Sequence, residues 1–572
     1  MDRKRRLMEN NNGWPLRNQL FDGAPIALPL THTVIGRGGL TPSFTRATTE
    51  TGQKWDETGY LDFTALAGEM VFKGARREYN QWTTSSVSLA NGANKSLTLA
   101  AGTYQFSMGA GTGTATFSGT GGATGTLAAS TGRVSVAKTI SAGTFVVTAS
   151  VADLADLQVC NITGETDQTT IRPYVSVGVE SAPAYHGSMV DGVKCFDTDR
   201  SGNPIAASTL KGYLAEPAAT NYALQSNALN TAPWYDIGSP SATQNVTGPN
   251  GQANYAWTLT DDNPAVNEAK AQDITLTAAT WTSSALVGKT VGAQPSYPIL
   301  YSYSPVSGLI AICTIDTSNG VATVWTAYTG LVIATGLTAR CSSYGPNFWL
   351  VELVYTGTAT AWQHALIAAG TTNATQSTGA PAAATTGSAV YCDIQTELGA
   401  AATSRINTTT LAVTRPADVL SYTGGDIPNL KTLAATFQRA VGVSSVGVVA
   451  ELHDGTANED TYVFLSTAAN IAFISRDGGS TQWQSNSAVT PTNTYTAGTT
   501  RKVAWSSSAA NYKADDGGTA LTLQVLGSGQ GTVNTLGVGC YNNSLFQLNG
   551  NVGGIYGWTR NLSQSELAAV DR

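Results

Sequence analysis

The chain carries one kind of stretch twice: first as Trp55-Asp56-Glu57-Thr58-Gly59 … Lys73-Gly74-Ala75-Arg76 … Asn80, and later as Phe196-Asp197-Thr198-Asp199 … Lys211-Gly212-Tyr213-Leu214-Ala215-Glu216-Pro217 … Asn221. Each copy leads into a long segment rich in Thr, Ser, Gly and Ala. Each segment then closes on the same pattern, at Asp156-Leu157-Gln158 and at Asp393-Ile394-Gln395. A repeated opening motif and a repeated closing motif indicate an array of modules rather than one catalytic domain.

Length and composition predict that these modules are folded. A chain of 572 residues has room for roughly three to four domains. Only 12% of the residues are charged, whereas 42% are apolar. Disorder requires low hydrophobicity together with high net charge, and a net charge of −7 over this length does not meet that requirement.

Apolar and polar residues alternate in short runs between glycine-rich turns. Leu97 and Leu99, and then Tyr104, Phe106 and Met108, occupy one face, and their polar neighbours occupy the other. Short strands with frequent turns predict antiparallel sandwiches. We therefore expect an all-β chain of tandem antiparallel β-sandwiches of the jelly-roll type. Its predicted parts are an extended N-terminal anchor (1–40), a first sandwich with its opening motif (41–180), a second sandwich with its opening motif (181–417) and a terminal jelly roll (418–572).

The end of the chain predicts a helix. Ser563-Gln564-Ser565-Glu566 has the pattern of a capping box, in which the serine and the glutamate side chains satisfy free backbone N–H groups. Leu562 and Leu567 stand at the two positions of a hydrophobic staple.

The N-terminal segment has the composition of an anchor. Four basic residues, Arg3-Lys4-Arg5-Arg6, precede spaced apolar residues that include Trp14, Leu20 and Phe21. Prolines forbid a regular helix over residues 1–40. An extended segment with spaced apolar side chains suits docking on a partner. A solvated terminus, or a strap folded back over the first domain of this chain, is the alternative.

The sequence predicts neither a metal site nor a cofactor. The six cysteines lie far apart and form no C-x-x-C pair, so we expect reduced, buried thiols, although Cys313 and Cys341 could meet across one sandwich. The run His453-Asp454-Gly455 … Asn458-Glu459-Asp460 gathers oxygen ligands of the kind that calcium prefers. It lacks the spacing of a calcium loop, and we interpret it as a solvated turn.

The net charge and the hydropathy of the sequence also limit which kinds of partner are expected. The net negative charge is spread thinly, so no specific nucleic-acid partner is expected. No run of about 18 apolar residues is present, and no membrane insertion is expected. The start of the chain lacks the apolar core of a signal peptide. Such a chain needs another way out of the cell, and release by lysis inside an assembled particle is one such way.

Sugar binding requires an aromatic face beside amide or carboxylate groups. Trp483 stands in a polar run, Thr481-Gln482-Trp483-Gln484-Ser485, that favours exposure, and Tyr541-Asn542-Asn543 is similar. These four residues, Trp483, Tyr541, Asn542 and Asn543, are the predicted glycan contacts. The alternative for Trp483 is an aromatic that covers the edge of a sheet.

The run from Lys211 to Tyr222, with Trp234 downstream, resembles a motif of bacteriophage tail-fibre and virion appendage proteins. In those proteins the motif precedes a sandwich similar to a carbohydrate-binding module. Phe44-Thr45-Arg46-Ala47-Thr48 resembles the start of the same unit, although the first opening motif lacks the Glu-Pro pair. Residues 418–572, which contain Ile555-Tyr556-Gly557-Trp558, resemble a concanavalin-like jelly roll of the laminin-G type.

The resemblance implies a surface appendage of a phage particle, a tail or head fibre, and a homotrimer. Such a protein is expected to be made in the host cytoplasm and released by lysis. Its expected partners are other virion proteins (tail, portal or adaptor, or capsid) and the host surface polysaccharide. No catalytic motif is present in the sequence, so we expect no enzymatic activity. Two alternatives stay open, namely a purely structural capsid decoration or collar protein and a polysaccharide depolymerase, because carboxylate pairs act through space.

Overall fold

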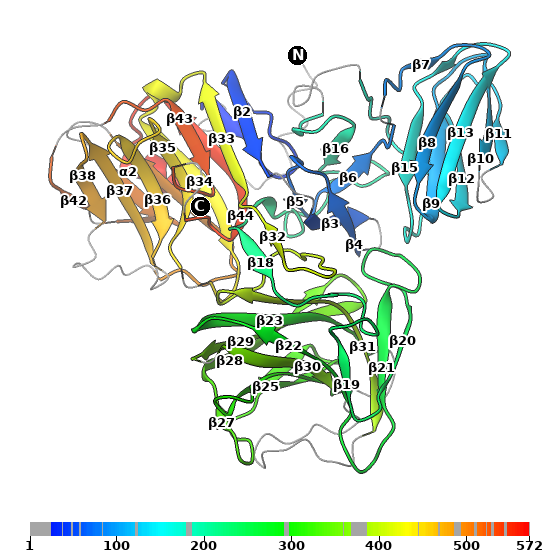
Figure 1. Ribbon diagram of the computed structural model, residues 1–572. Helices are drawn as coiled ribbons and strands as arrows, with labels where there is room; N and C mark the ends of the chain where they lie inside the picture. The colour runs from blue at the N-terminus through cyan, green and yellow to red at the C-terminus, as the bar shows by residue number, and fades with distance from the viewer. Residues whose placement is uncertain are drawn as a thin grey trace. The chain divides into compact units, whose positions relative to one another are not determined.

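The computed structural model of the chain is built almost entirely of β-strands (Figure 1). It describes residues 24–36, 38–46, 50–56, 59–82, 84–119, 124–178, 186–290, 297–358, 360–367, 386–443, 445–466, 470–485, 494–507, 512–521, 523–527, 531–542 and 546–570. The predicted all-β class with antiparallel sandwiches is confirmed. These residues form two compact units. The C-terminal unit contains the residues up to Thr45, Lys211–Glu216 and Asp418–Arg572, and the middle unit contains Arg46–Leu210 and Pro217–Ala417.

The C-terminal unit is a sandwich of two sheets. The strands of the first sheet are β1 (Ile26–Leu28), β17 (Gly212–Ala215), β34 (Thr432–Arg439), β39 (Arg501–Ser506), β40 (Lys513–Asp516), β41 (Thr519–Ala520) and β44 (Gly550–Trp558). They run in the order β41-β40-β39-β34-β44, and both β17 and β1 pair with the remaining edge of β44.

The second sheet, here called the front sheet, runs in the order β2-β33-β43-β35-β36-β37-β38-β42. Its strands are β2 (Leu40–Thr45), β33 (Val419–Gly424), β35 (Gly447–His453), β36 (Asp460–Leu465), β37 (Ile471–Asp477), β38 (Ser480–Ser485), β42 (Leu523–Val525) and β43 (Thr535–Val538). Phe473 of this sheet packs on Trp505 of the first sheet, with ring centroids 5.9 Å apart. The core of the unit therefore lies between these two sheets.

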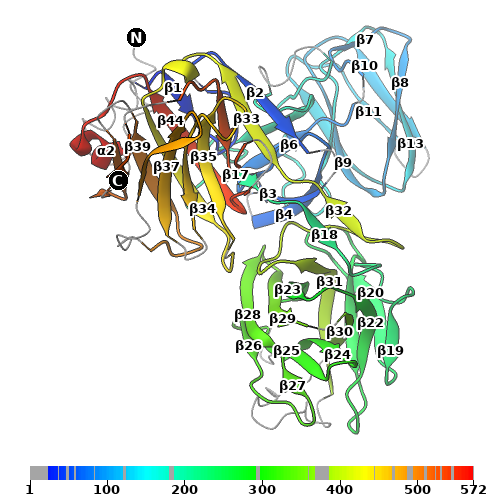
Figure 2. The ribbon, with the colours of Figure 1, turned by 60° about the vertical axis from the view of Figure 1, so that its left-hand side comes forward.

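Strands from outside 418–572 complete this unit. The blue strand β2 lies beside the yellow strand β33 in both views (Figures 1 and 2), paired from Leu40 with Gly424 to Thr45 with Val419. The described part of the predicted anchor thus supplies β1 and the first residue of β2. The second opening motif supplies β17, where Gly212 has φ +99° and a Cβ would lie 2.3 Å from the Val552 carbonyl oxygen. The unit therefore extends beyond the predicted range, because the free edges of its sheets accept these strands.

The middle unit holds two sandwiches. In the first, one sheet runs β11-β10-β13-β8, another runs β12-β9-β15, and β14 pairs with β7. Their bounds are β7 (Ser88–Leu89), β8 (Asn94–Leu99), β9 (Gly102–Met108), β10 (Thr114–Gly119), β11 (Gly125–Leu127), β12 (Val134–Ile140), β13 (Gly143–Ser150), β14 (Leu154–Ala155) and β15 (Gln158–Asn161). The core of this sandwich is aromatic, and the rings of Phe106 and Phe145 stack with centroids 4.2 Å apart.

The second sandwich consists of a sheet β19-β22-β30-β24-β25-β26, to which β27 adds beside β25, and a sheet β20-β21-β31-β23-β29-β28. Their bounds are β19 (Tyr235–Ile237), β20 (Ser241–Val246), β21 (Ala256–Asp261), β22 (Ala269–Thr275), β23 (Ala279–Gly288), β24 (Ile299–Ser304), β25 (Leu309–Asp316), β26 (Val321–Val324), β27 (Val332–Ile333), β28 (Thr335–Tyr344), β29 (Phe348–Gly357), β30 (Ala361–Ile367) and β31 (Gly387–Leu398). The short connecting strands are β3 (Glu50–Asp56), β4 (Gly59–Ala65), β5 (Phe72–Lys73), β6 (Arg76–Tyr79), β16 (Val193–Phe196), β18 (Ala219–Asn221) and β32 (Val413–Arg415).

The asparagine that ends the second opening motif joins it to the closing motif. The buried Asn221 side chain donates from Nδ2 to the carbonyl oxygens of Ile394 (3.1 Å) and Ile406 (2.8 Å). Its Oδ1 accepts from the backbone N–H groups of Ala223 and Thr396, each at 3.0 Å. One amide side chain thus satisfies four buried backbone groups.

The first module repeats this arrangement residue for residue. Asn80 Nδ2 donates to the carbonyl oxygens of Leu157 (3.1 Å) and Val175 (2.8 Å). Asn80 Oδ1 accepts from the N–H groups of Val159 (3.1 Å) and Trp82 (3.4 Å). The aspartate of each closing motif has a left-handed backbone, with φ of 49° at position 156 and 50° at position 393. The predicted duplication of opening and closing motifs is therefore confirmed in the folded chain, and we call each network an asparagine clasp.

Other local predictions were tested by the structure. The capping box before α2 (Gln564–Val570) is formed, since the Glu566 carboxylate accepts from the Ser563 N–H at 2.7 Å and Leu562 is fully buried. Cys313 and Cys341 are free thiols, so the disulfide between them is not formed. A short 3-10 helix, η1 (Ile427–Asn429), follows β33. Among the described residues, no helix has the length and apolar composition needed to cross a bilayer.

Candidate functional site

The front sheet of the C-terminal unit carries aromatic side chains on the face that points away from the core. Because neighbouring residues of a strand point to opposite faces, Val463 points into the sandwich and Tyr462 points outward. Tyr462 lies 5.5 Å from Phe464 and 5.0 Å from Tyr541, and Tyr541 lies 5.9 Å from Phe546, measured between ring centroids. We call the rings of Phe464, Tyr462, Tyr541 and Phe546 the aromatic row.

Phe546 is the unusual member of this row. It exposes 51% of its surface and has φ +48°, a left-handed conformation that costs a residue with a side chain about 1–2 kcal/mol. Its carbonyl oxygen accepts a hydrogen bond from the Val448 N–H at 2.8 Å, which holds the backbone in place. Core packing does not account for a half-exposed aromatic ring on a strained backbone. Such strain is typical of functional sites.

A charged cluster lies beside the aromatic row. Arg476 Nη1 is 2.9 Å from Asp460 Oδ2 and donates to the Tyr541 hydroxyl at 3.0 Å, while its Nη2 donates to the Tyr462 hydroxyl at 3.2 Å. The Tyr541 hydroxyl in turn donates to Asp460 Oδ2 at 2.9 Å. Arg476 retains 25% of its side-chain exposure. The cluster fixes both phenol rings and still presents a cation to solvent.

Two buried carboxyl groups complete the face. Glu451 Oε2 accepts from the Asn542 N–H at 2.6 Å. Glu451 Oε1 and Asp460 Oδ1 are buried and have no hydrogen-bond partner among the described residues. Burial, together with the charge of Asp460, raises the pKa of Glu451 to about 8. Burial also raises the pKa of Asp460, although Arg476 and Tyr541 act in the opposite direction. Glu451 is therefore mostly protonated at neutral pH and can donate a hydrogen bond.

The prediction that Trp483 is exposed is wrong. Its side chain has no exposed surface and packs against Tyr512, with ring centroids 5.4 Å apart. Trp483 pairs with Ser475 and Val525 in the front sheet, at a position that points toward the core. Its polar neighbours in sequence belong to the opposite face of β38, so they indicate nothing about its own exposure.

The other predicted contacts divide into two groups. Tyr541 is 8% exposed and lies in the aromatic row, and Asn542 is half-buried and binds Glu451 through its N–H. Their contact with glycan stays a prediction. Asn543 and the anchor residues Arg3, Lys4, Arg5, Arg6, Trp14, Leu20 and Phe21 lie outside the described residues.

The sequence patterns did not predict five residues of this face, namely Tyr462, Phe464, Arg476, Glu451 and Phe546. The available signal was in β36, where Tyr462 and Phe464 alternate with Val463 and Leu465, so that both faces of one strand carry large apolar side chains. A strand with one solvated face should instead alternate with small polar residues.

The calcium-like run forms a turn, as interpreted from the sequence. Asp454 Oδ1 accepts from the N–H (2.8 Å) and the hydroxyl group (2.7 Å) of Thr456. The His453 Nδ1 accepts from the Gly455 N–H at 2.9 Å. Among the described residues, no group of three or more His, Cys, Asp or Glu side chains is arranged to hold a metal ion.

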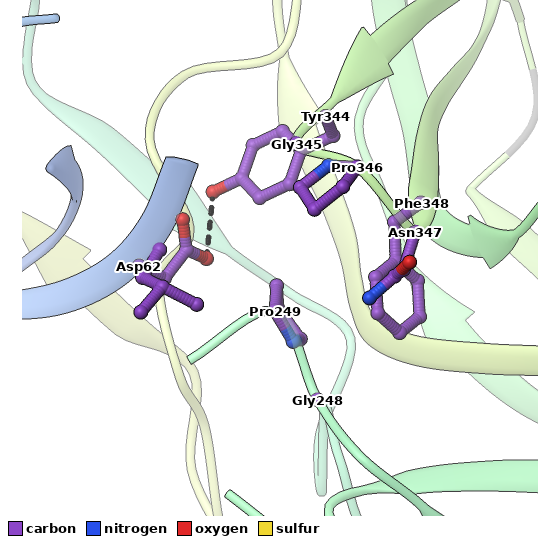
Figure 3. A pocket seen from close by; sticks show the side chains of 9 residues that line it. Asp62, Gly248, Pro249, Tyr344, Gly345, Pro346, Asn347 and Phe348 are labelled. Carbon is purple, nitrogen blue, oxygen red and sulfur yellow. Dashed lines mark hydrogen bonds between the residues drawn. The ribbon is translucent and has the colours of Figure 1, made fainter. Parts of the chain in front are cut away.

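A small pocket in the middle unit is a second candidate (Figure 3). The Asp62 carboxylate points at the Tyr344 hydroxyl, which donates to it at 2.9 Å, and Pro249 and Asn347 line the space beside them. Burial raises the pKa of Asp62 well above its ordinary value, and the charge of Asp393 adds to this effect. The cavity of about 20 Å³ has room for roughly one water molecule. We therefore interpret it as a structural joint and not as a sugar site.

Some solved structures resemble part of the chain. No protein-family model and no curated protein matches the chain. The carbohydrate-binding module CBM40 of a Ruminococcus gnavus IT-sialidase, bound to α2,3-sialyllactose, is 15% identical, with 25% of this chain and 84% of that chain covered and a TM-score of 0.21. A leech intramolecular trans-sialidase is 14% identical over 25% of this chain and 23% of that chain, with a TM-score of 0.20. Domains LG4-5 of the mouse laminin α1 chain are 11% identical over 61% of this chain and 92% of that chain, with a TM-score of 0.18. Sequence identities and TM-scores this low assign no function to the chain.

Proposed function

We propose that the chain is a non-enzymatic appendage of a bacteriophage particle that binds host cell-surface glycan through the front sheet of its C-terminal unit. The observation that carries the glycan proposal is Phe546, a half-exposed ring on a left-handed backbone at the end of the aromatic row. A pyranose ring would stack on Phe546, since aromatic faces bind the apolar face of a sugar. Arg476 beside the row keeps 25% of its side-chain surface exposed and supplies a donor for sugar hydroxyl groups.

The virion setting is supported by the sequence motif from Lys211 to Tyr222 and by the tandem β modules. Attachment to the particle is assigned to the N-terminal residues, with a tail, portal or capsid protein as the partner. A homotrimer is proposed on the same resemblance to fibres. Several copies on one particle would multiply weak single-site affinity through avidity.

Binding of the full chain to arrays of bacterial surface polysaccharides tests the glycan proposal. The full chain is needed because β1, β2 and β17 come from outside 418–572. We expect wild-type protein to bind at least one polysaccharide and Phe546→Ala to lose at least about tenfold in affinity, equivalent to about 1.4 kcal/mol. Leu526→Ala is the matched control, because this apolar residue of the same unit exposes 54% of its surface. Absence of binding to every polysaccharide would favour the purely structural decoration or collar role.

One observation favours a depolymerase as the second candidate. Glu451 and Asp460 are buried on the same face, both have raised pKa values, and each has an oxygen without a partner among the described residues. A protonated acid beside a second carboxyl group is the pairing that glycoside hydrolysis uses. Incubating the protein with each polysaccharide that it binds, and measuring new reducing ends, tests this candidate. Reducing ends that appear with wild type and vanish with Glu451→Gln would establish it and overturn the non-enzymatic assignment.

A further inference from the structure

A second polar and aromatic surface lies in the middle unit, on the sheet β19-β22-β30-β24-β25-β26. One face of this sheet points into the sandwich core, where Trp362 of β30 packs on Tyr355 of the opposite sheet with ring centroids 4.9 Å apart. Gln363, the next residue along β30, therefore points away from the core. Its cross-strand partners Asp273 and Tyr303 share that outer face.

Four side chains on this outer face form a continuous hydrogen-bonded relay. The Tyr301 hydroxyl donates to Gln363 Oε1 at 3.1 Å, and Gln363 Nε2 donates to the Tyr235 hydroxyl at 2.7 Å. The Tyr235 hydroxyl then donates to Asp273 Oδ1 at 2.9 Å. We call Tyr301, Gln363, Tyr235 and Asp273 the tyrosine relay. It crosses β24, β30, β22 and β19 and fixes the direction of every hydroxyl group in it.

The relay stands over a floor of small residues. Tyr301 is paired with Ala365 across β24 and β30, and Tyr235 is paired with Ala271 across β19 and β22. Both alanines are fully buried. The alanines therefore belong to a covered layer below the relay. Tyr235, in contrast, exposes 38% of its surface, so its phenol ring is open to a ligand.

The relay retains free hydrogen-bonding capacity for a ligand. Each tyrosine oxygen has a further acceptor site, Gln363 Nε2 has a second N–H, and Asp273 has a second carboxylate oxygen. The charge on this face selects the ligand class. Asp273 is exposed, whereas Lys270 and Asp236, which lie 2.5 Å apart, alternate to the opposite face of the sheet. The exposed carboxylate of Asp273 repels anionic groups.

We propose that the tyrosine relay is a second glycan-binding site, specific for neutral sugar chains. The exposed ring of Tyr235 stacks on a pyranose ring, and the fixed donors and acceptors of the relay bind equatorial and axial hydroxyl groups. The site lies in a different unit from the aromatic row and shares no residue with it. The proposal therefore stands or fails independently of the proposed function.

Affinity electrophoresis of the full chain tests this site. The gels contain dextran, laminarin, galactomannan or xylan as neutral probes, and alginate or hyaluronan as acidic probes. We expect at least one neutral polysaccharide to retard wild type and Tyr235→Ala to weaken that retardation at least about tenfold. Val306→Ala is the matched control, because this residue of the same unit is 76% exposed and lies in the turn after β24. It should behave as wild type.

A conservative variant separates binding from folding. Tyr235→Phe keeps the ring and removes both hydrogen bonds of its hydroxyl group, so we expect partial loss of retardation with an unchanged melting temperature. Retardation lost in Phe546→Ala but kept in Tyr235→Ala would overturn the relay site and leave the proposed function intact. Retardation by acidic polysaccharides alone, by none, or equally of wild type and both Tyr235 variants would also overturn it.

Discussion

The asparagine clasp of the second module gives a quantitative prediction. Asn221→Ala removes four hydrogen bonds between 2.8 and 3.1 Å, two of which, to Ile394 and Thr396, tie the opening motif to the strand of the closing motif. At about 1 kcal/mol for each bond, the variant should lose about 4 kcal/mol of local stability. The loss is this large because the partners are buried backbone groups that lose a hydrogen bond. Asn80→Ala should cost slightly less, since its bond to Trp82 is long at 3.4 Å.

Hydrogen exchange followed by mass spectrometry measures this effect at the affected amides. Peptides that contain Ala223 and Thr396 should lose protection by roughly 10³-fold in Asn221→Ala, the equivalent of 4 kcal/mol. Asn230→Ala is the control, because its side chain makes one exposed hydrogen bond, to the Ala242 carbonyl oxygen, and its protection should stay within about threefold of wild type. A loss below about tenfold in Asn221→Ala would refute the clasp as the element that joins the two motifs.

Three further variants test the C-terminal unit. Burial raises the pKa of Glu451 from its ordinary 4.5 to about 8 in the folded protein. The folded protein therefore binds this proton more tightly than the unfolded chain, and the free energy of unfolding of wild type should fall as the pH rises from 4.5 to 8. The fall should be at most about 5 kcal/mol. Urea denaturation at pH 5 and pH 8.5 should show this fall in wild type and a smaller one in Glu451→Gln; equal falls would contradict the assignment. Gly212→Ala should lower the melting temperature, because its Cβ would lie 2.3 Å from a carbonyl oxygen at φ +99°, and an unchanged temperature would count against this packing. Trp483→Ala should cost about 3–5 kcal/mol of stability without changing glycan affinity per folded molecule, and a selective loss of affinity would restore Trp483 as a contact.

The modular β fold could be predicted from the sequence because its determinants are local. Alternation placed Phe106 in the core of the first sandwich, and the capping box located α2. Asn80 and Asn221 stand at the same place in the two opening motifs, and each binds the backbone of its own closing motif. Each of these features depends on residues close together in the chain or on a pattern that occurs twice.

Features that depend on long-range pairing could not be predicted in this way. Gln105 alternates as an outward polar residue, yet it is buried, because the segment around Thr170 covers it and accepts its Nε2 N–H at 2.9 Å. Strands β1, β2 and β17 join a unit whose other strands lie hundreds of residues later. The exposure of Trp483 could not be predicted from Gln482 and Gln484, because adjacent residues of a strand point to opposite faces of the sheet. Phe546 lies in the aromatic row with a left-handed backbone, φ +48°, and the residue type phenylalanine does not predict that conformation.

Replacing Phe546 by glycine tests the central claim most directly, since binding and stability should change independently. Glycine removes the exposed ring and relieves a left-handed strain of about 1 kcal/mol. The account predicts that Phe546→Gly melts at or above the wild-type temperature while losing at least about tenfold in affinity for the polysaccharide that wild type binds. Wild-type affinity in a stably folded Phe546→Gly protein would contradict the claim that the aromatic row binds glycan.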